Sequence, residues 1–140
     1  EPALSGLLAK NSNLKVICAV NDIWKDVYKN ENGYPQSTLI VKTSFAKENK
    51  EFVESFVKAL DENINWTNKN PKEAGEYASK FGVSLKPELL VKAIDRTNLK
   101  FISAKDSKED YTNYFEILNS FNPKVLGGSI PKDDIFYLSK

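Results

Sequence analysis

The sequence predicts an α/β protein made of strand-helix units, with a C-terminal half that is rich in helices. Two short apolar runs, residues 14–20 and 37–41, contain many β-branched side chains and have the length of buried strands. Between residues 52 and 64, apolar side chains instead recur at spacings of one, three and four, which is the pattern of a helix with one apolar face. Such a face must cover an apolar surface, and the preceding strand is the nearest one.

The first 33 residues are expected to form a helix, a strand and a second, shorter helix. Residues 2–10 begin with a proline and carry leucines on one side, as in a short helix. The run 14–20 is apolar apart from Lys15, which predicts a strand that is buried on both faces. Residues 21–28 follow as one or two helical turns. The polar residues 29–33 predict a turn that serves as a lobe boundary or hinge.

Capping and helix-breaking residues divide the rest of the chain. After the strand at 37–41, a turn at residues 43–44 leads into a long helix that ends at 68–70. Asn70 is expected to cap the next helix, with Pro71 at its first position. The remaining predicted elements are helices at 71–81, from 87 to 97 and from a capping box at Ser107 to 121, a short extended piece at 99–102, and an aromatic tail at 130–137 that packs back onto the body.

Composition argues against several kinds of function. The chain has 20 basic and 19 acidic residues without a concentrated basic run, so no nucleic-acid partner is expected. It has no histidine, a single cysteine and no phosphate-binding or nucleophile motif, so we expect no metal, no cofactor and no catalytic residue. The cysteine, Cys18, lies within the first predicted strand, where a buried and unreactive thiol is expected.

Three stretches carry a family pattern. Glu1-Pro2-Ala3 opens a helix, the predicted strand and helix from Leu39 to Leu60 lead to Asn70-Pro71-Lys72-Glu73-Ala74, and the tail from Tyr114 to Tyr137 contains Asn122-Pro123-Lys124 and Gly127-Gly128. In this order, and covering essentially all 140 residues, they resemble the C-terminal part of the solute-binding proteins of ABC transporters. That group includes nitrate, taurine, alkanesulfonate and thiamine-precursor binders, and the tail resembles that of a lipoprotein subgroup.

The resemblance implies a partial type II periplasmic-binding-protein fold and a role that is not enzymatic. Residues 1–33 would be the end of a second lobe with its hinge, and residues 34–140 the returning part of a first lobe plus C-terminal helices. The protein would be extracytoplasmic, either periplasmic or lipid-anchored at the cell surface. It would clamp a small organic or anionic solute between two lobes and deliver it to an ABC permease in the membrane. We expect the chain to be a fragment whose partner is the missing N-terminal half.

Five residues are the predicted ligand contacts. Glu1 stands at the tip of the first helix, where it either faces an amine or heteroaromatic N–H of the ligand or caps its own helix. Gln36 and Ser37 are polar residues at the start of the returning strand. Trp24 and Tyr34, on either side of the predicted hinge, would stack on a flat ligand or pack in the core. Tyr28 beside them has the same two alternatives but is not counted among the five.

Two other readings stay open. An enzyme of the thiamine-precursor-synthesis type would share the fold, but it needs a catalytic histidine, and this chain has none. A free-standing helical interaction module would instead have a closed core without an exposed apolar edge.

Overall fold

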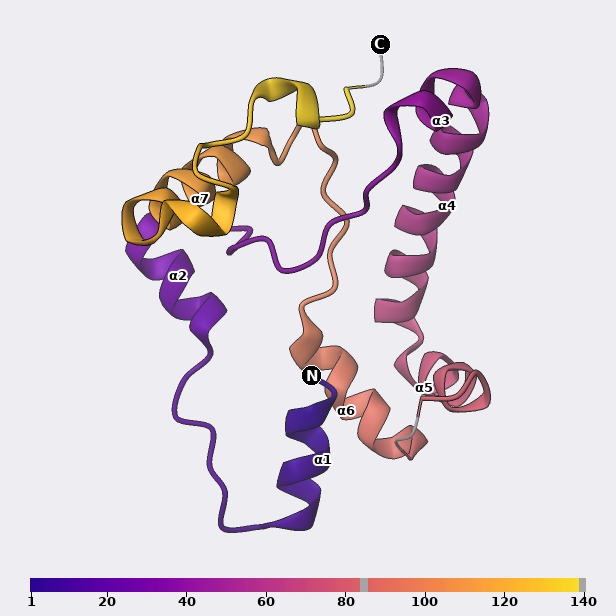
Figure 1. The fold of residues 1–140 in the computed structure, drawn as a ribbon. Helices are drawn as coiled ribbons and strands as arrows, with labels where there is room; N and C mark the ends of the chain where they lie inside the picture. The colour runs from indigo at the N-terminus through magenta and orange to yellow at the C-terminus, as the bar shows by residue number, and fades with distance from the viewer. Residues whose placement is uncertain (84–85, 139–140) are drawn as a thin grey trace. The chain divides into compact units, whose positions relative to one another are not determined.

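The computed structural model describes residues 1–83 and 86–138, which fold into helices joined by extended segments (Figure 1). Contacts between residues divide the chain into two compact units. The first unit consists of residues 1–16 and 46–101, and the second of residues 17–45 together with the chain from 102 onward. The chain therefore passes from one unit to the other three times.

Helix packing holds the first unit together. Its helices are α1 (Ala3–Lys10), α4 (Lys50–Lys69), α5 (Pro71–Lys80) and α6 (Pro87–Thr97). Helix α6 packs against both α5 and α1, and α4 contacts α5 and α6. The buried apolar side chains are mostly small: Ala46, Val53, Ala74, Leu90 and Ala93. Small side chains let the helix backbones approach closely, so this core depends on short distances between helices and not on large buried rings.

Gly75 marks the tightest approach between α5 and α6. A Cβ atom built on Gly75 would lie 3.0 Å from the carbonyl oxygen of Pro87 and 3.5 Å from the Cβ of Leu90. Leu90 is only 6% exposed. Because the nearest of these neighbours is a backbone atom, it cannot move aside as a flexible side chain would. The missing side chain at Gly75 is therefore what allows the two helices to pair.

The second unit contains α2 (Val20–Tyr28), α7 (Lys108–Phe121) and two short 3₁₀ turns, η1 (Pro123–Leu126) and η2 (Asp133–Ile135). The turn η1 packs back on α7. Lys108 Nζ donates to Asp133 Oδ2 at 2.6 Å, and the ring of Phe136 meets that of Tyr111 edge to face at 6.1 Å between centroids. These contacts confirm that the C-terminal tail packs onto the helix before it.

Helix positions agree with the sequence in most places. Proline occupies the first turn of α5 and of α6, and Asn98 ends α6 with φ 51°, in the left-handed region. The long predicted helix is divided in two, because α3 (Thr43–Glu48) ends before Asn49 and α4 begins after it. The predicted turn at residues 43–44 is wrong, since both residues are already helical in α3.

Two predicted side-chain caps are wrong. Asn70 does not cap α5, and its amide group instead donates to the carbonyl oxygen of Trp66 at 2.8 Å, at the end of α4. Ser107 does not cap α7, because its hydroxyl donates backward to the carbonyl oxygen of Ser103 at 2.8 Å. In both cases the polar side chain binds a carbonyl behind it and not an amide ahead of it. The helices begin where expected, with different local hydrogen bonds.

The predicted strands do not form a sheet, so the α/β class is not confirmed. Among the described residues, 15–18 and 36–41 make no backbone–backbone hydrogen bond. Their apolar side chains face solvent: Ile17 is 97% exposed and Ile40 86%. Cys18 is exposed as well, against the prediction of a buried thiol. The physical reason is that a strand requires a partner strand for its backbone groups, and neither segment lies beside one here.

The polar turn at residues 29–33 does not separate the two units. Contacts place all of residues 17–45 in the second unit, so the predicted lobe boundary after Gly33 falls within it. The three passages between units instead occur after residues 16, 45 and 101. The assignment of residues 1–33 and 34–140 to two lobes stays a prediction.

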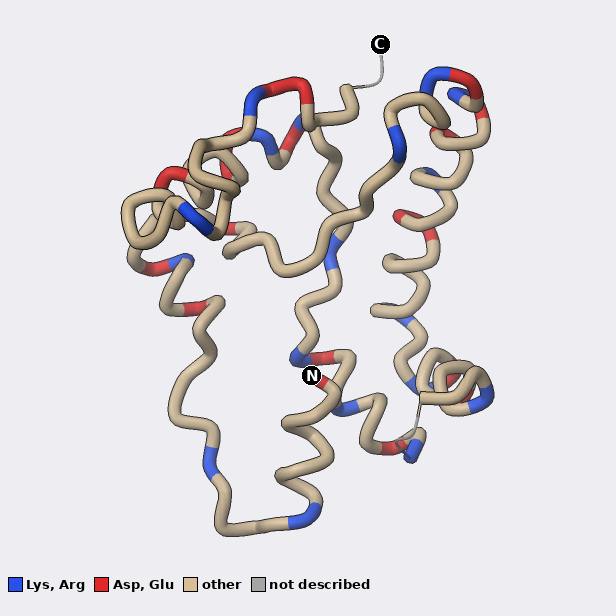
Figure 2. Tube along the Cα trace, in the orientation of Figure 1, with Lys and Arg blue, Asp and Glu red and all other residues tan. Residues whose placement is uncertain are grey.

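Charged residues of both signs are spread along α4 (Figure 2). Two exposed pairs at helical spacing, Lys50–Glu54 at 3.7 Å and Lys58–Glu62 at 3.9 Å, add little stability because water screens them. They instead keep one side of α4 hydrated. Across the described part of the chain, no helix combines the length and the apolar character needed to cross a membrane.

The close approach at Gly75 yields the first prediction. Replacing Gly75 with valine should lower the free energy of unfolding by about 1–3 kcal/mol, because the new side chain meets the Pro87 carbonyl and the packed Leu90. Thermal unfolding followed by circular dichroism measures the change. Glu76→Val, at the exposed neighbouring position, is the control for the helix propensity of valine. Equal destabilisation by both substitutions would contradict the close contact.

Candidate functional site

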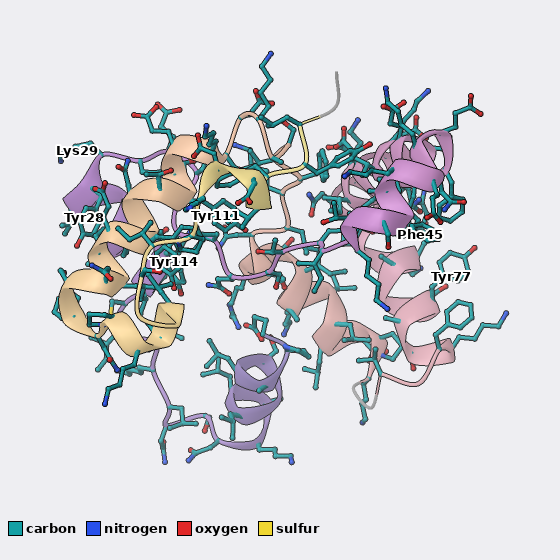
Figure 3. The ribbon with its side chains drawn as sticks, turned by 45° about the horizontal axis from the view of Figure 1, so that its top comes forward. Tyr28, Lys29, Phe45, Tyr77, Tyr111 and Tyr114 are labelled. Carbon is teal, nitrogen blue, oxygen red and sulfur yellow. The ribbon has the colours of Figure 1, made fainter. Side chains whose placement is uncertain are left out.

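Four aromatic side chains from three parts of the second unit meet in one group, called here the aromatic cluster: Trp24, Tyr28, Tyr34 and Tyr114. The ring centroid of Trp24 lies 5.6 Å from those of both Tyr34 and Tyr114, and 4.2 Å from that of Tyr28. Tyr34 and Tyr114 stack at 6.4 Å with an interplanar angle of 21°. Figure 3 shows Tyr28 and Tyr114 in place on α2 and α7.

Burial in the aromatic cluster is graded. Trp24, Tyr34 and Tyr114 are half-buried, whereas Tyr28 is exposed. The rings therefore pack against one another as the core of the second unit and keep part of their surface open to solvent. Both alternatives for Trp24 and Tyr34, packing in the core and presenting a ring to a ligand, are compatible with this arrangement.

Polar groups border the aromatic cluster. The Gln36 side-chain amide donates to the Tyr34 hydroxyl at 2.8 Å. The hydroxyl groups of Thr38 and Tyr111 share a short hydrogen bond, so residues 34–38 are tied to α7 at that point. An aromatic surface with neighbouring amide and hydroxyl groups suits a flat ligand that carries hydrogen-bonding atoms.

The turn that precedes Tyr34 is fixed to the start of α7 by the carboxylate of Asp110. Its Oδ1 accepts from the Asn30 side-chain amide at 2.8 Å, and its Oδ2 accepts from that of Asn32 at 2.9 Å. Within the turn, the backbone N–H of Asn32 donates to Oδ1 of Asn30 at 2.7 Å. A single carboxylate thus holds two side chains of the turn.

Glu1 lies in the first unit and caps α1. Its Oε2 accepts from the backbone N–H of Ser5 at 2.9 Å, and its Oε1 lies 3.4 Å from Nη1 of Arg96. The Glu1 side chain is 4% exposed. Burial acts to raise the pKa of this carboxyl, but the hydrogen bonds from Ser5 and Arg96 outweigh it, so the pKa lies below its ordinary value. This is the capping alternative; a ligand contact by Glu1 stays a prediction.

The structure thus brings three of the five predicted ligand contacts together. Trp24, Tyr34 and Gln36 touch within the second unit, and Ser37 follows Gln36 as an exposed residue. The sequence pattern gives no indication that Tyr114 lies beside Trp24. Nor does it indicate that Asp110 binds the side chains of Asn30 and Asn32. Both residues lie on α7, whose pattern of aromatic and acidic residues does not reveal contacts with residues about 80 positions earlier in the chain.

The described residues contain no group of three or more histidine, cysteine, aspartate or glutamate side chains that could hold a metal ion. The aromatic cluster and the polar groups beside it offer ring stacking and hydrogen bonding by amide, hydroxyl and carboxylate groups.

Comparisons with known proteins give two matches. A family model described as NMT1/THI5 like matches residues 20–74, which include α2, the turn and Tyr34. The fold is similar to the crystal structure of an ABC transporter from Parabacteroides distasonis, with a TM-score of 0.82 and 21% sequence identity. That likeness covers 100% of this chain and 48% of the other, so the chain spans about half the length of that structure. No curated protein matches the chain.

These two matches confirm the resemblance to ABC-transporter solute-binding proteins that the sequence motifs indicate. At 21% identity the structural likeness establishes the fold. The family match covers the segment that contains four of the five predicted ligand contacts, Trp24, Tyr34, Gln36 and Ser37.

The Glu1 cap yields the second prediction. Glu1→Gln keeps an oxygen that can accept from the Ser5 N–H but removes the charge. It should lower the free energy of unfolding by about 1 kcal/mol at neutral pH, because a hydrogen bond to a charged acceptor is stronger than one to a neutral acceptor. Because the pKa of Glu1 is lowered on folding, its contribution is present above the ordinary carboxyl pKa and disappears as the pH falls through the lowered value. The two proteins should therefore converge in stability in acid. Urea unfolding across pH measures this, and a difference that persists unchanged in strong acid would contradict it.

Proposed function

We propose that the chain is the C-terminal part of the solute-binding component of an ABC importer, which acts outside the cytoplasm and is not an enzyme. The family match over residues 20–74 and the fold shared with an ABC transporter structure support a solute-binding role. The ligand class is a small organic or anionic solute, and the partner is a membrane permease. We further propose that the protein has a type II periplasmic-binding-protein fold and is either periplasmic or lipid-anchored.

The observation that carries this proposal is the pair of extended apolar segments in a chain half as long as its structural relative. Ile17 and Ile40 are almost fully exposed, and the backbone around them makes no backbone–backbone hydrogen bond to other described residues. Exposed apolar surface of this kind marks a site of interaction. The likeness covers 48% of the relative. The proposed partner for both segments is an N-terminal half of the same protein.

Solute binding would follow from the closing of two lobes around the ligand. In this proposal residues 1–33 end the second lobe and residues 34–140 return to the first, joined by extended chain. A solute that contacts both lobes favours the closed form, because it binds that form more tightly than the open one. The closed form is then the species that the permease recognises.

The proposed solute contacts are Trp24, Tyr34, Gln36 and Ser37. The rings supply flat surfaces, and Gln36 and Ser37 supply hydrogen-bonding groups. Glu1 is the weakest of the five predicted contacts, because its carboxylate is already used by Ser5 and Arg96. The alternative of a closed helical interaction module is less well supported, since such a module would not leave Ile17 and Ile40 in solvent.

The third prediction tests solute binding. A thermal-shift screen of the full-length protein against sulfonates, nitrate, pyrimidines and short peptides should find a solute that stabilises the folded protein. At a concentration of 100 times Kd, such a solute should raise the free energy of unfolding by about 2.7 kcal/mol. Tyr34→Ala and Gln36→Ala should each weaken that binding. Tyr77→Ala, which removes an exposed tyrosine from α5 in the first unit, should leave it unchanged. If no solute stabilises a folded full-length protein, the proposal fails.

The fourth prediction tests the missing half through Cys18. In the 140-residue chain the exposed Cys18 should be alkylated by iodoacetamide nearly as fast as in urea-unfolded chain. In the full-length protein the same thiol should be protected, because the N-terminal half would cover the segment around it. Mass spectrometry of the peptide that contains Cys18 measures both rates. Equal rates in the two proteins would rule out coverage of this segment.

A further inference from the structure

We propose that Asp110 is a positioning residue that fixes the aromatic cluster by holding the turn at residues 29–33 against α7. Two independent hydrogen bonds, to Asn30 at 2.8 Å and to Asn32 at 2.9 Å, use both oxygens of its carboxylate. Hydrogen bonds to an ionised acceptor are stronger than those between neutral groups. One side chain on α7 therefore restrains the position and the orientation of the whole turn.

Two features restrict the turn in addition to its hydrogen bonds with Asp110. Lys29 adopts φ 53°, in the left-handed region, where the chain reverses after α2. Gly33 is buried, and a Cβ atom there would lie only 1.9 Å from Oδ1 of Asn21. The turn is thus packed against Asn21 on one side and bonded to Asp110 on the other.

The turn held by Asp110 lies between two residues of the aromatic cluster in the sequence. Trp24 lies on the helix that leads into the turn, and Tyr34 directly follows it. Asp110 and Tyr114 are four residues apart on α7, so they lie on the same side of that helix. Helix α7 therefore supplies both the carboxylate that holds the turn and the ring that Trp24 and Tyr34 pack against. Loss of the carboxylate should let Trp24 and Tyr34 move away from Tyr114.

The placement of the rings by Asp110 stands on these contacts alone. Its consequence for solute binding rests on the proposed function, which assigns Trp24 and Tyr34 to the ligand. The two can fail separately: a thermal-shift screen without a hit contradicts the proposed function, whereas the experiment below needs no solute.

The experiment uses the fluorescence of Trp24. The chain has two tryptophans, so Trp66→Phe leaves Trp24 as the only one. In that background, Asp110→Ala should shift the Trp24 emission to longer wavelength, increase its quenching by acrylamide and reduce the near-ultraviolet circular dichroism of the packed rings. Glu109→Ala, which removes the same charge from the neighbouring exposed position on α7, should change none of the three.

A second route guards against a general loss of folding. Asn30→Ala combined with Asn32→Ala removes the two donors and keeps Asp110 intact, so it should reproduce the Asp110→Ala spectra. Adding Asp110→Ala to this pair should produce no further change, since the same bonds are already lost. Far-ultraviolet circular dichroism shows whether the helices persist. Unchanged Trp24 signals in the asparagine variant, or in a folded Asp110→Ala variant, would overturn the inference.

Discussion

A helix satisfies its backbone hydrogen bonds from its own residues, whereas a strand needs a second strand, and this difference governs the whole structure. Within the described residues every regular element is a helix or a 3₁₀ turn. The two segments with the strongest β pattern keep an extended backbone but remain unpaired. Local hydrogen bonding and short side-chain contacts therefore decide which parts of this chain become ordered elements, and apolar pattern alone does not.

The same difference explains how much of the fold the sequence predicts. Proline at the start of α5 and α6 and Asn98 after α6 act within one turn of the backbone, so these boundaries are readable from neighbouring residues. The caps proposed for Asn70 and Ser107 are not, because each side chain has a carbonyl within reach behind it that competes with the amides ahead. The strands at 14–20 and 37–41 depend on residues outside their own neighbourhood, and there the prediction of a sheet does not hold.

For the candidate site, the sequence is informative about chemistry and less so about assembly. Trp24, Tyr34 and Gln36 lie close together in the sequence, near the turn. The prediction that they belong to one site agrees with the contacts between them. Tyr114 and Asp110 join them from a helix that begins more than 70 residues later. Nothing in the local pattern of α7 distinguishes a ring that faces α2 from one that faces its own tail, as Tyr111 does toward Phe136. Long-range packing of this kind needs coordinates.

The open extended segments also bear on how the chain behaves before any partner covers them. Apolar β-prone stretches with free backbone groups tend to join edge to edge with other copies, the first step toward aggregation. Lys15 stands within the first segment and Lys42 closes the second, and both are exposed. Burying a lysine ammonium between stacked chains is unfavourable, so a charge at each of these two positions opposes such pairing.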